Sequence, residues 1–556
     1  MGLLGAALIL LVFPGTDARG ADWVVTGTEV RQGVPISLEG NLIVESRGSL
    51  TLRGITLTFN NTTHGQFGIR VKSGGAITIE SNSLITTASN DARIYFVVEA
   101  DAFLVMRSSE LRRCGWPGMT GYEPPGQENG LVVRGSVTME TSTFAEYPLI
   151  LLTSPGSGGT IVGNSFTSDG HAEGHLFILT RSGTTIRGNT FGPNELFGVS
   201  FYTSHHNVIR DNTFDGVAHG AVAFRQAWDN EFANNKVTGG AGPYVMGRSG
   251  NNRIVNNSFD GGEGISVFNS DNNTILGNTV INRSHWGLLL SYSSHNLVAD
   301  NTFGENQVVG SQAVVELIHA SDNLILNNRV TPRSVDGGAF VGILLWLSSC
   351  NNTVQGNTIT GARRGLSLHY ASNGNTLSRN HVEASLEQAV VVEESEGNSL
   401  FLNNVVGAGR TPMDDTGRNR WDDGTSGNYW SDYAGGGAPY PIPPAGADRR
   451  PLATPVAIAP VPVSPLAPIP VPVPSFYPRL DVVSDVVVEG RTLIGSVGVA
   501  AGGRLTLRDA SLLLDGDTTS ILVQPGGALE VERSTIAPIE GGRGASPSTC
   551  CPGRRL

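Results

Sequence analysis

The segment NVIRDNTF at residues 207–214 indicates a repeat protein, because it returns as NTILGNTV at 273–280 and NLVADNTF at 296–303. Each copy has an Asn, an apolar residue, a second Asn at a turn, and a β-branched or aromatic residue two positions later. Ten steps of the second Asn cover 403−164 = 239 residues, a mean of about 24. It occurs at Asn164, Asn189, Asn212, Asn235, Asn257, Asn278, Asn301, Asn328, Asn357, Asn380 and Asn403.

A short segment with apolar residues at every second position precedes many copies, as in GVSFYTS (198–204), GLLLSYS (287–293) and GILLWLS (342–348). Such short strands cannot bury their faces as isolated hairpins, whereas stacked coils share one interior. The pattern therefore predicts an all-β solenoid, a parallel β-helix. A β-propeller, the alternative, would need antiparallel hairpins and a longer period.

The recurring asparagines have a structural interpretation. Asn tolerates the left-handed conformation of a tight corner, and amide side chains stacked from coil to coil can hydrogen-bond in a ladder. We therefore predict a structural Asn ladder at the eleven positions above rather than a ligand site.

Composition excludes several classes of protein. Glycine supplies 72 of 556 residues and charged residues only 15%, which argues against a coiled coil or a helix-rich enzyme. The net charge is −12 and no basic cluster occurs. We therefore expect no nucleic-acid partner.

The N-terminus indicates export. Residues 2–13 form an apolar run followed by Pro14 and Gly15, which is typical of a secretory signal and too short to span a bilayer. We predict a signal peptide at residues 1–20, although a buried first strand is the alternative. No later run of eighteen apolar residues occurs, so we expect no transmembrane span in the mature chain and a secreted or cell-surface protein, periplasmic in a host with an outer membrane.

Composition and repeats also suggest the domain boundaries. Fourteen prolines lie among residues 439–478, and a GG-x-apolar pattern at 502–507 returns 24 residues later at 526–531. The prolines predict an extended spacer, with a peptide ligand for a partner domain as the alternative. The predicted segments are N-terminal β-helix coils 21–140, main repeats 141–408, an aromatic capping segment 409–438, a Pro-rich linker 439–479, a short or truncated second β-helix 480–541 and an unassigned tail 542–556.

A second motif follows the last repeat. WDDG at 421–424 and GNYWSDY at 427–433, together with the Asn coils, resemble the right-handed parallel β-helix proteins of the NosD-like family, also described as carbohydrate-binding and sugar-hydrolase (CASH) domains. The resemblance covers roughly residues 140–452 and implies a surface protein of the archaeal type. Its relatives commonly carry an aspartate-rich, calcium-like stretch after Tyr433, where this chain has only AGGGA.

The aromatic residues of this segment predict a cap. An open end of a β-helix exposes unpaired backbone, and large rings can cover it. The proposed capping residues are Trp421, Tyr429, Trp430 and Tyr433. An aromatic platform for a sugar is the alternative.

The outward positions of the upstream strands predict a ligand face. One column holds Tyr202, Arg225, Phe268, Ser291, Ile318, Trp346 and His369, and its neighbour holds Gln226, Asn269, Tyr292, His319 and Tyr370. Aromatic rings among polar groups suit the apolar faces and hydroxyls of sugars. The candidate ligand face is therefore Tyr202, Phe268, Tyr292, Trp346 and Tyr370, and exposed residues placed only for strand propensity are the alternative.

Catalysis would require a base or paired carboxylates on this face. The candidates are Glu316, His319, His369 and Arg225, with Glu393 and Glu394 farther along the sheet. The histidines and methionines are scattered and zinc spacing is missing, so no cofactor or metal site is predicted. Calcium and copper are the two metals considered, copper because NosD is named for a role in the maturation of a copper enzyme.

These observations predict an exported carbohydrate-interaction module. The expected partner is a polysaccharide or other glycan, with surface-layer or envelope components as further partners. A lyase, epimerase or hydrolase acting on polysaccharide is the first alternative, and an accessory protein for copper-enzyme maturation is the second.

Overall fold

The computed structural model describes residues 17–116, 129–146, 149–153, 158–168, 174–304, 313–332, 341–383 and 385–463, together with nine strands between 479 and 538. Most of the predicted signal peptide, the linker beyond residue 463 and the tail 542–556 lie outside the described residues. The chain divides into two compact units, Met1–Thr153 with Gly159–His175, and Ser154–Gly158 with Leu176–Leu556. Each unit is described by itself.

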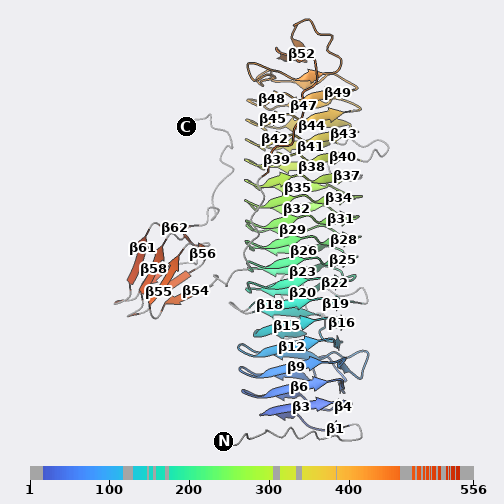
Figure 1. Ribbon diagram of the computed structural model, residues 1–556, viewed down its shortest axis with the longest axis vertical. Coiled ribbons are helices and arrows are strands. Elements are labelled where there is room, and N and C mark those ends of the chain that lie inside the picture. The colour runs from blue at the N-terminus through green and yellow to red at the C-terminus, as the bar shows by residue number, and fades with distance from the viewer. Residues whose placement is uncertain are drawn as a thin grey trace, which may run out of the picture. The chain divides into compact units, whose positions relative to one another are not determined.

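The larger unit consists of coils that each contribute three short strands, one to each of three parallel sheets. Successive coils pair in parallel, with Val199 opposite Val222, Ile209 opposite Phe232, and Phe214 opposite Val237. Figure 1 shows these strands stacked side by side from coil to coil. Two successive coils are formed by β23 (Phe197–Tyr202), β24 (Val208–Arg210), β25 (Thr213–Asp215), β26 (Gly220–Arg225), β27 (Glu231–Ala233) and β28 (Lys236–Thr238). The predicted all-β parallel β-helix is confirmed.

The sheet that begins each coil carries the candidate ligand face. Its strands are two to six residues long, and their inward residues are apolar, as the period-two pattern predicts. After β23 and β26 its strands are β29 (Tyr244–Met246), β32 (Ile265–Phe268), β35 (Leu288–Ser291), β38 (Ala313–Ile318), β41 (Val341–Trp346), β44 (Arg364–His369), β47 (Val390–Glu393) and β50 (Met413–Asp414).

Stacked phenylalanines fill part of the interior. The rings of Phe191 and Phe214, which lie opposite each other in one sheet, stack at 4.7 Å. Phe214 also contacts Phe232 of a neighbouring sheet, with the ring centres 5.7 Å apart. All three side chains are fully buried. Because parallel coils place equivalent residues one strand spacing apart, each apolar column becomes a continuous stack.

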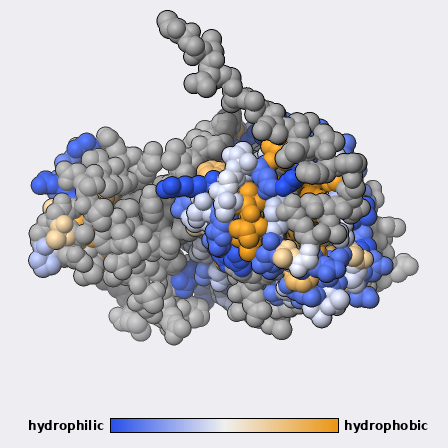
Figure 2. Space-filling view, turned by 90° about the horizontal axis from the view of Figure 1, so that it is seen from below, coloured by the Kyte–Doolittle hydropathy of each residue, from blue (hydrophilic) through white to orange (hydrophobic). Residues whose placement is uncertain are grey.

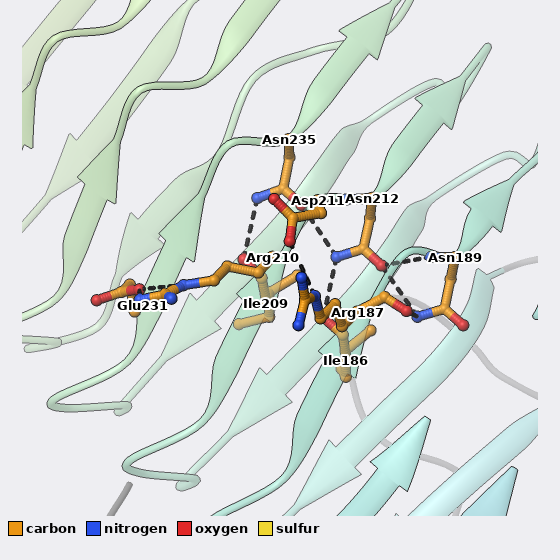
Figure 3. Close-up of polar contacts among 9 residues, drawn as sticks. All are labelled: Ile186, Arg187, Asn189, Ile209, Arg210, Asp211, Asn212, Glu231 and Asn235. Carbon is orange, nitrogen blue, oxygen red and sulfur yellow. Dashed lines mark hydrogen bonds and ion pairs between the residues drawn. The ribbon is translucent and has the colours of Figure 1, made fainter. Parts of the chain in front are cut away.

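The predicted asparagines from Asn189 to Asn403 form a hydrogen-bonded ladder, part of which Figure 3 shows. Asn164 accepts the backbone N–H of Ser142 and donates to the Met139 carbonyl, each at 2.9 Å. Asn212 Nδ2 donates to Asn235 Oδ1 at 3.0 Å and to the carbonyl of Ile186 at 3.0 Å. Its Oδ1 accepts from both the side chain and the backbone N–H of Asn189, each at 2.9 Å. The left-handed residue of this corner is the one before the ladder asparagine, as at Asp211 with φ of 56°. The ladder asparagines therefore serve as hydrogen-bonding groups rather than as the strained corner residue.

A second ladder runs five residues upstream of the first. Asn207 Nδ2 donates to Asn230 Oδ1 at 2.9 Å, and Asn230 Nδ2 to Asn252 Oδ1 at 3.0 Å. The repeat begins with this first Asn, although a ladder was predicted only for the second. From β24 to β48 (Ser399–Phe401), the two ladders flank the middle strand of each coil and satisfy buried backbone groups at both of its ends. The second ladder continues through Asn273, Asn296, Asn323, Asn352, Asn375 and Asn398 to Asn419.

The smaller, N-terminal unit is also built from parallel coils. Its coils are connected chiefly by ion pairs and by serine side chains at the corners, where the larger unit has asparagine ladders. Its strands β6 (Ser49–Arg53) and β9 (Ala76–Glu80) pair in register, and Arg53 Nε donates to Glu80 Oε1 at 2.7 Å. Figure 2 shows hydrophobic residues in separate patches among hydrophilic ones on the face seen from below. Phe103, which is 51% exposed, is one of the exposed apolar side chains of this unit.

Two buried aspartates end the two ladders. The longer ladder passes from Asn403 to Asn428, whose backbone N–H donates to Asp448 Oδ2 at 2.7 Å. The indole of Trp430 donates to the same oxygen at 3.0 Å. A carboxylate is an acceptor only, so it satisfies the last amide without needing a further coil.

The second ladder ends in the same way. Asn419 Nδ2 donates to Asp414 Oδ1 at 3.0 Å, and the Trp421 indole donates to Asp414 Oδ2 at 2.9 Å. Trp421 and Trp430 are buried, whereas Tyr429 and Tyr433 are only partly buried. The aromatic segment thus covers the last coil chiefly through its two tryptophans, each anchored to an aspartate.

Gly427 permits a close approach in this cap. A Cβ at this position would overlap the Asp448 carboxylate, well inside van der Waals contact. We expect Gly427→Ala to lower the free energy of unfolding by about 2 kcal/mol, because Asp448 must move away from its donors. Urea unfolding followed by circular dichroism measures this loss. Gly27→Ala is the control, since Gly27 has open space around it and its φ is not positive; an equal loss in both variants would contradict a steric cause.

The C-terminal strands form a short second β-helix, as predicted. They make three parallel sheets of three strands each, and Val499, Leu505 and Leu507 are buried in their core. The strands are β54 (Arg479–Val482), β55 (Asp485–Glu489), β56 (Thr492–Ile494), β57 (Ser496–Val499), β58 (Arg504–Arg508), β59 (Ser511–Leu514), β60 (Ile521–Val523), β61 (Ala528–Glu532) and β62 (Thr535–Pro538).

Candidate functional site

The outward residues at the ends of the sheet strands form one column in register. Tyr202 lies opposite Arg225, and Phe268 lies opposite Ser291. Higher in the same column, Ile318 lies opposite Trp346. The register then continues through His369, which lies opposite Glu393. The structure therefore places the predicted column on one face of one sheet.

The neighbouring column occupies a left-handed corner. Tyr292 and Tyr370 have φ of 50° and 53°, and Asn269 in the same column has φ of 45°. Asn adopts this conformation readily, but a bulky residue does so at a cost of order 1 kcal/mol. Tyr292 and Tyr370 are 57% and 48% exposed, so burial does not offset that cost. The same corner is left-handed at Gln226, His319 and Glu394, so the conformation belongs to the coil, and the two tyrosines are exposed aromatic residues at that corner.

The upper part of this face gathers aromatic and titratable groups. His369 Nδ1 lies 2.7 Å from Glu393 Oε2. The Tyr370 ring lies 6.2 Å from the His369 ring and 6.4 Å from the Trp346 ring. One coil further, Asp415 accepts the backbone N–H of Glu394 at 3.0 Å. We call Trp346, His369, Tyr370, Glu393 and Asp415 the upper site.

Burial lowers the pKa of His369, while the nearby carboxylate of Glu393 opposes this shift. The imidazole is therefore neutral at pH 7. A hydrogen bond from Nδ1–H to Glu393 leaves Nε2 as an acceptor. Such a group can accept a proton or a hydroxyl hydrogen bond from a ligand.

The remaining candidates are not brought into the upper site. Arg225 lies six coil steps below His369 in the column, about 29 Å at one strand spacing per step. Its guanidinium carbon lies 5.7 Å from the centre of the Phe197 ring. His319 lies two steps below Tyr370 and stacks on Tyr292 at 4.6 Å. Glu316 faces outward but is only 4% exposed, in register with Leu289 and Leu344.

Sequence reasoning missed one member of the upper site. Asp415 follows β50, the shortest strand of this sheet. This strand lies within the segment predicted to form the cap, so its two residues were not recognised as a strand of the sheet. The alignment of Val391 with Met413 is the signal that would have identified it, because it places Asp415 opposite Glu393.

The described residues do not match the requirements of a copper site. Among them, no three His, Cys, Asp or Glu side chains are grouped so that they could hold a metal ion. Cys114 and Cys350 are buried in different units, and burial raises the pKa of the Cys114 thiol. In the part of the chain that the structure describes, no helix has the length and apolarity needed to span a membrane.

Comparison with known proteins gives one family match. The model of the family described as "Periplasmic copper-binding protein (NosD)" matches residues 156–314 and 260–435. Together these ranges cover 435−156+1 = 280 of the 556 residues, or half of the chain. No curated protein matches the chain in sequence.

Several solved structures are similar at low sequence identity. A mutant of the periplasmic alginate epimerase AlgG is 16% identical, with 62% of this chain and 78% of that chain covered and a TM-score of 0.35. The A-module of a mannuronan C-5 epimerase from Azotobacter vinelandii is 14% identical, with 71% and 90% covered and a TM-score of 0.25. A double mutant of the tailspike protein of E. coli bacteriophage HK620 is 13% identical, with 66% and 74% covered and a TM-score of 0.40.

Proposed function

Because the chain belongs to the NosD family of parallel β-helix proteins, we propose that it is an exported glycan-binding protein whose ligand face is the outer surface of one sheet. The observation that carries the proposal is the column of outward side chains, in register from Tyr202 to Glu393. It presents aromatic rings to solvent beside hydrogen-bonding groups. A flat sheet with this surface suits an extended sugar chain, whose rings are apolar on their faces and polar at their edges.

The upper site is the proposed centre of recognition. Trp346 and Tyr370 offer ring faces, while His369 Nε2 and the carboxylates of Glu393 and Asp415 accept hydrogen bonds from hydroxyl groups. The two carboxylates also disfavour a strongly anionic sugar at this position. We therefore expect a neutral or amino-substituted glycan here rather than a polyuronate.

Retention of the full chain on a glycan array tests this proposal. We expect Trp346→Ala and Tyr370→Ala each to weaken retention about tenfold, which corresponds to one lost stacking contact. Phe103→Ala is the matched control, because it removes an exposed aromatic side chain of the other unit. Unchanged retention in both site variants, or an equal loss in the control, would contradict the proposed face.

Polysaccharide cleavage or epimerisation is the second candidate function, favoured by the His369–Glu393 pair. A neutral histidine oriented by a carboxylate is a suitable general base. Analysis of the array eluates separates the two candidates. Mass spectrometry detects cleavage products, and proton NMR of the eluted glycan detects epimerised residues, which have the same mass as the original ones. Either product, if it disappears in His369→Gln, would make the protein an enzyme, whereas retention without products supports binding alone.

Export is proposed on the apolar run at residues 2–13 and on the family, which is described as periplasmic. The family description also names copper. Among the described residues, no three His, Cys, Asp or Glu side chains are grouped so that they could hold a metal ion, so we derive no copper chemistry from them. The accessory role in copper-enzyme maturation stays an alternative.

A further inference from the structure

The described part of the Pro-rich segment, which follows the cap, is hydrogen-bonded to the β-helix. Residues 453–463 (ATPVAIAPVPV) lie along the flank of the larger unit, where two asparagine side chains hold the backbone at two points. The two points are five residues apart in the segment. The spacer predicted from the prolines is therefore docked along part of its length.

Each asparagine holds one residue by two hydrogen bonds. Asn404 Nδ2 donates to the Val456 carbonyl at 2.8 Å, and the Val456 N–H donates to Asn404 Oδ1 at 2.8 Å. Asn327 makes the same pair of bonds with Val461, both at 2.9 Å. A carboxamide that pairs with both polar groups of one residue reproduces the pairing of a neighbouring strand.

The spacing of the two clamps fits an extended peptide. Asn404 and Asn327 are separated by three coil steps, through β49 (Asn404–Val406), β46 (His381–Glu383), β43 (Thr358–Thr360) and β40 (Arg329–Thr331). Three strand spacings are about 14 Å. Five residues of a polyproline-type helix extend about 16 Å. The two clamps are also offset along the coil, since Asn404 begins its strand and Asn327 lies at the corner two residues before its strand.

The apolar side chains of the segment face the helix. Val456, Ile458 and Val461 are partly buried, whereas Ala457 and Ala459 are exposed. A groove of about 380 Å³ lies on this flank, and Gly356, Thr358 and His381 line it together with Val456, Ile458 and Pro460. Prolines at 455, 460 and 462 restrict the unbound segment, which lowers the entropic cost of holding it extended.

We propose that this flank is a recognition site for a polyproline-type peptide, and that residues 456–461 of the same chain are its ligand. Recognition depends on the hydrogen bonds that Asn404 and Asn327 make with the peptide backbone. It also depends on the apolar side chains at every second or third position of the segment. This site lies on a different sheet from the proposed glycan face, so the two proposals are independent.

Hydrogen–deuterium exchange of the full chain, resolved to single residues by mass spectrometry, tests the site. We expect the Val456 and Val461 amides to exchange about tenfold more slowly than those of Ala457 and Ala459. The alanines are internal controls, because they lie in the same segment with exposed side chains. Equal rates at all four amides would overturn the proposal.

An insertion variant tests the register without altering the helix. One extra alanine between Ala459 and Pro460 moves Val461 about 3 Å further along, away from Asn327. We expect Val461 to lose its protection while Val456 keeps it, and Asn404→Ala to give the opposite result. Protection of Val461 that survives the insertion would contradict recognition by paired clamps, as would protection that depends on protein concentration.

Discussion

Asn278→Asp is expected to lower the free energy of unfolding by about 5 kcal/mol at pH 7, because it removes two buried donors from the middle of the ladder. Asn278 Nδ2 donates to the Ile254 carbonyl at 2.8 Å and to Asn301 Oδ1 at 3.0 Å. A carboxylate of the same shape would place a negative charge against both of these acceptors. The change keeps side-chain volume nearly constant, so packing does not explain the loss.

Urea unfolding followed by circular dichroism measures this effect, and amide exchange locates it. We expect the faster exchange to be centred on the coil of Asn278, because each coil of a solenoid contacts only its neighbours. Thr279→Ala is the matched control, since Thr279 is the adjacent, exposed residue. A midpoint for Asn278→Asp that equals the control would show that the ladder does not contribute to stability.

Asp448→Ala is expected to cost about 4 kcal/mol, because it leaves the end of the longer ladder without an acceptor. The carboxylate accepts from Asn428 N at 2.7 Å, from Trp430 Nε1 at 3.0 Å and from Arg450 N at 3.0 Å. We expect the fluorescence of the cap tryptophans to change together with the unfolding midpoint. Asp432→Ala is the control, because Asp432 accepts the Tyr440 hydroxyl in the same segment and lies on the exposed side of the cap. An equal loss in both variants would contradict the special role of Asp448.

The pH dependence of the cap gives a second test of Asp448. Burial raises the pKa of Asp448 above its ordinary value of 3.8, and hydrogen bonds from Asn428, Trp430 and Arg450 oppose this shift. A raised pKa means that the folded state holds the proton more tightly than the unfolded state. The pH-dependent part of the free energy of unfolding that comes from Asp448 is therefore greatest below pH 3.8. It declines as pH rises through the folded-state pKa. Asp448→Asn should remove this part of the pH dependence; a slope identical to that of the unaltered chain would contradict it.

The repeat was predictable because its chemistry is local. Each copy contains the strand residues, the corner and the amide, and the mean step near 24 identifies a coil without any knowledge of its neighbours. The left-handed corner was placed one residue too late, since Asp211 and not Asn212 adopts it. Both types of residue tolerate that conformation, so composition alone does not separate them.

The membership of the outer column was also predictable, because inward and outward residues alternate along each strand. The exposure of its side chains and the groups that join it were not predictable. Glu316 is outward yet buried, and Asp415 joins the upper site from the end of a two-residue strand. Whether an outward side chain remains accessible depends on neighbouring coils, which a single repeat does not describe.

The parallel coils, the amide ladder and the aromatic cap could be predicted without a structure, because they depend on residues that recur or lie close together in the chain. Only the tertiary structure decided which distant groups meet. Ladder contacts span from 21 to 29 residues, so the number of residues per coil changes along the chain and sequence separation does not give position in a column. Asp448 ends a ladder whose last amide lies 20 residues before it, and Asn327 clamps Val461 across 134 residues. Such contacts form because stacking brings coils to one strand spacing, whatever the length of chain between them.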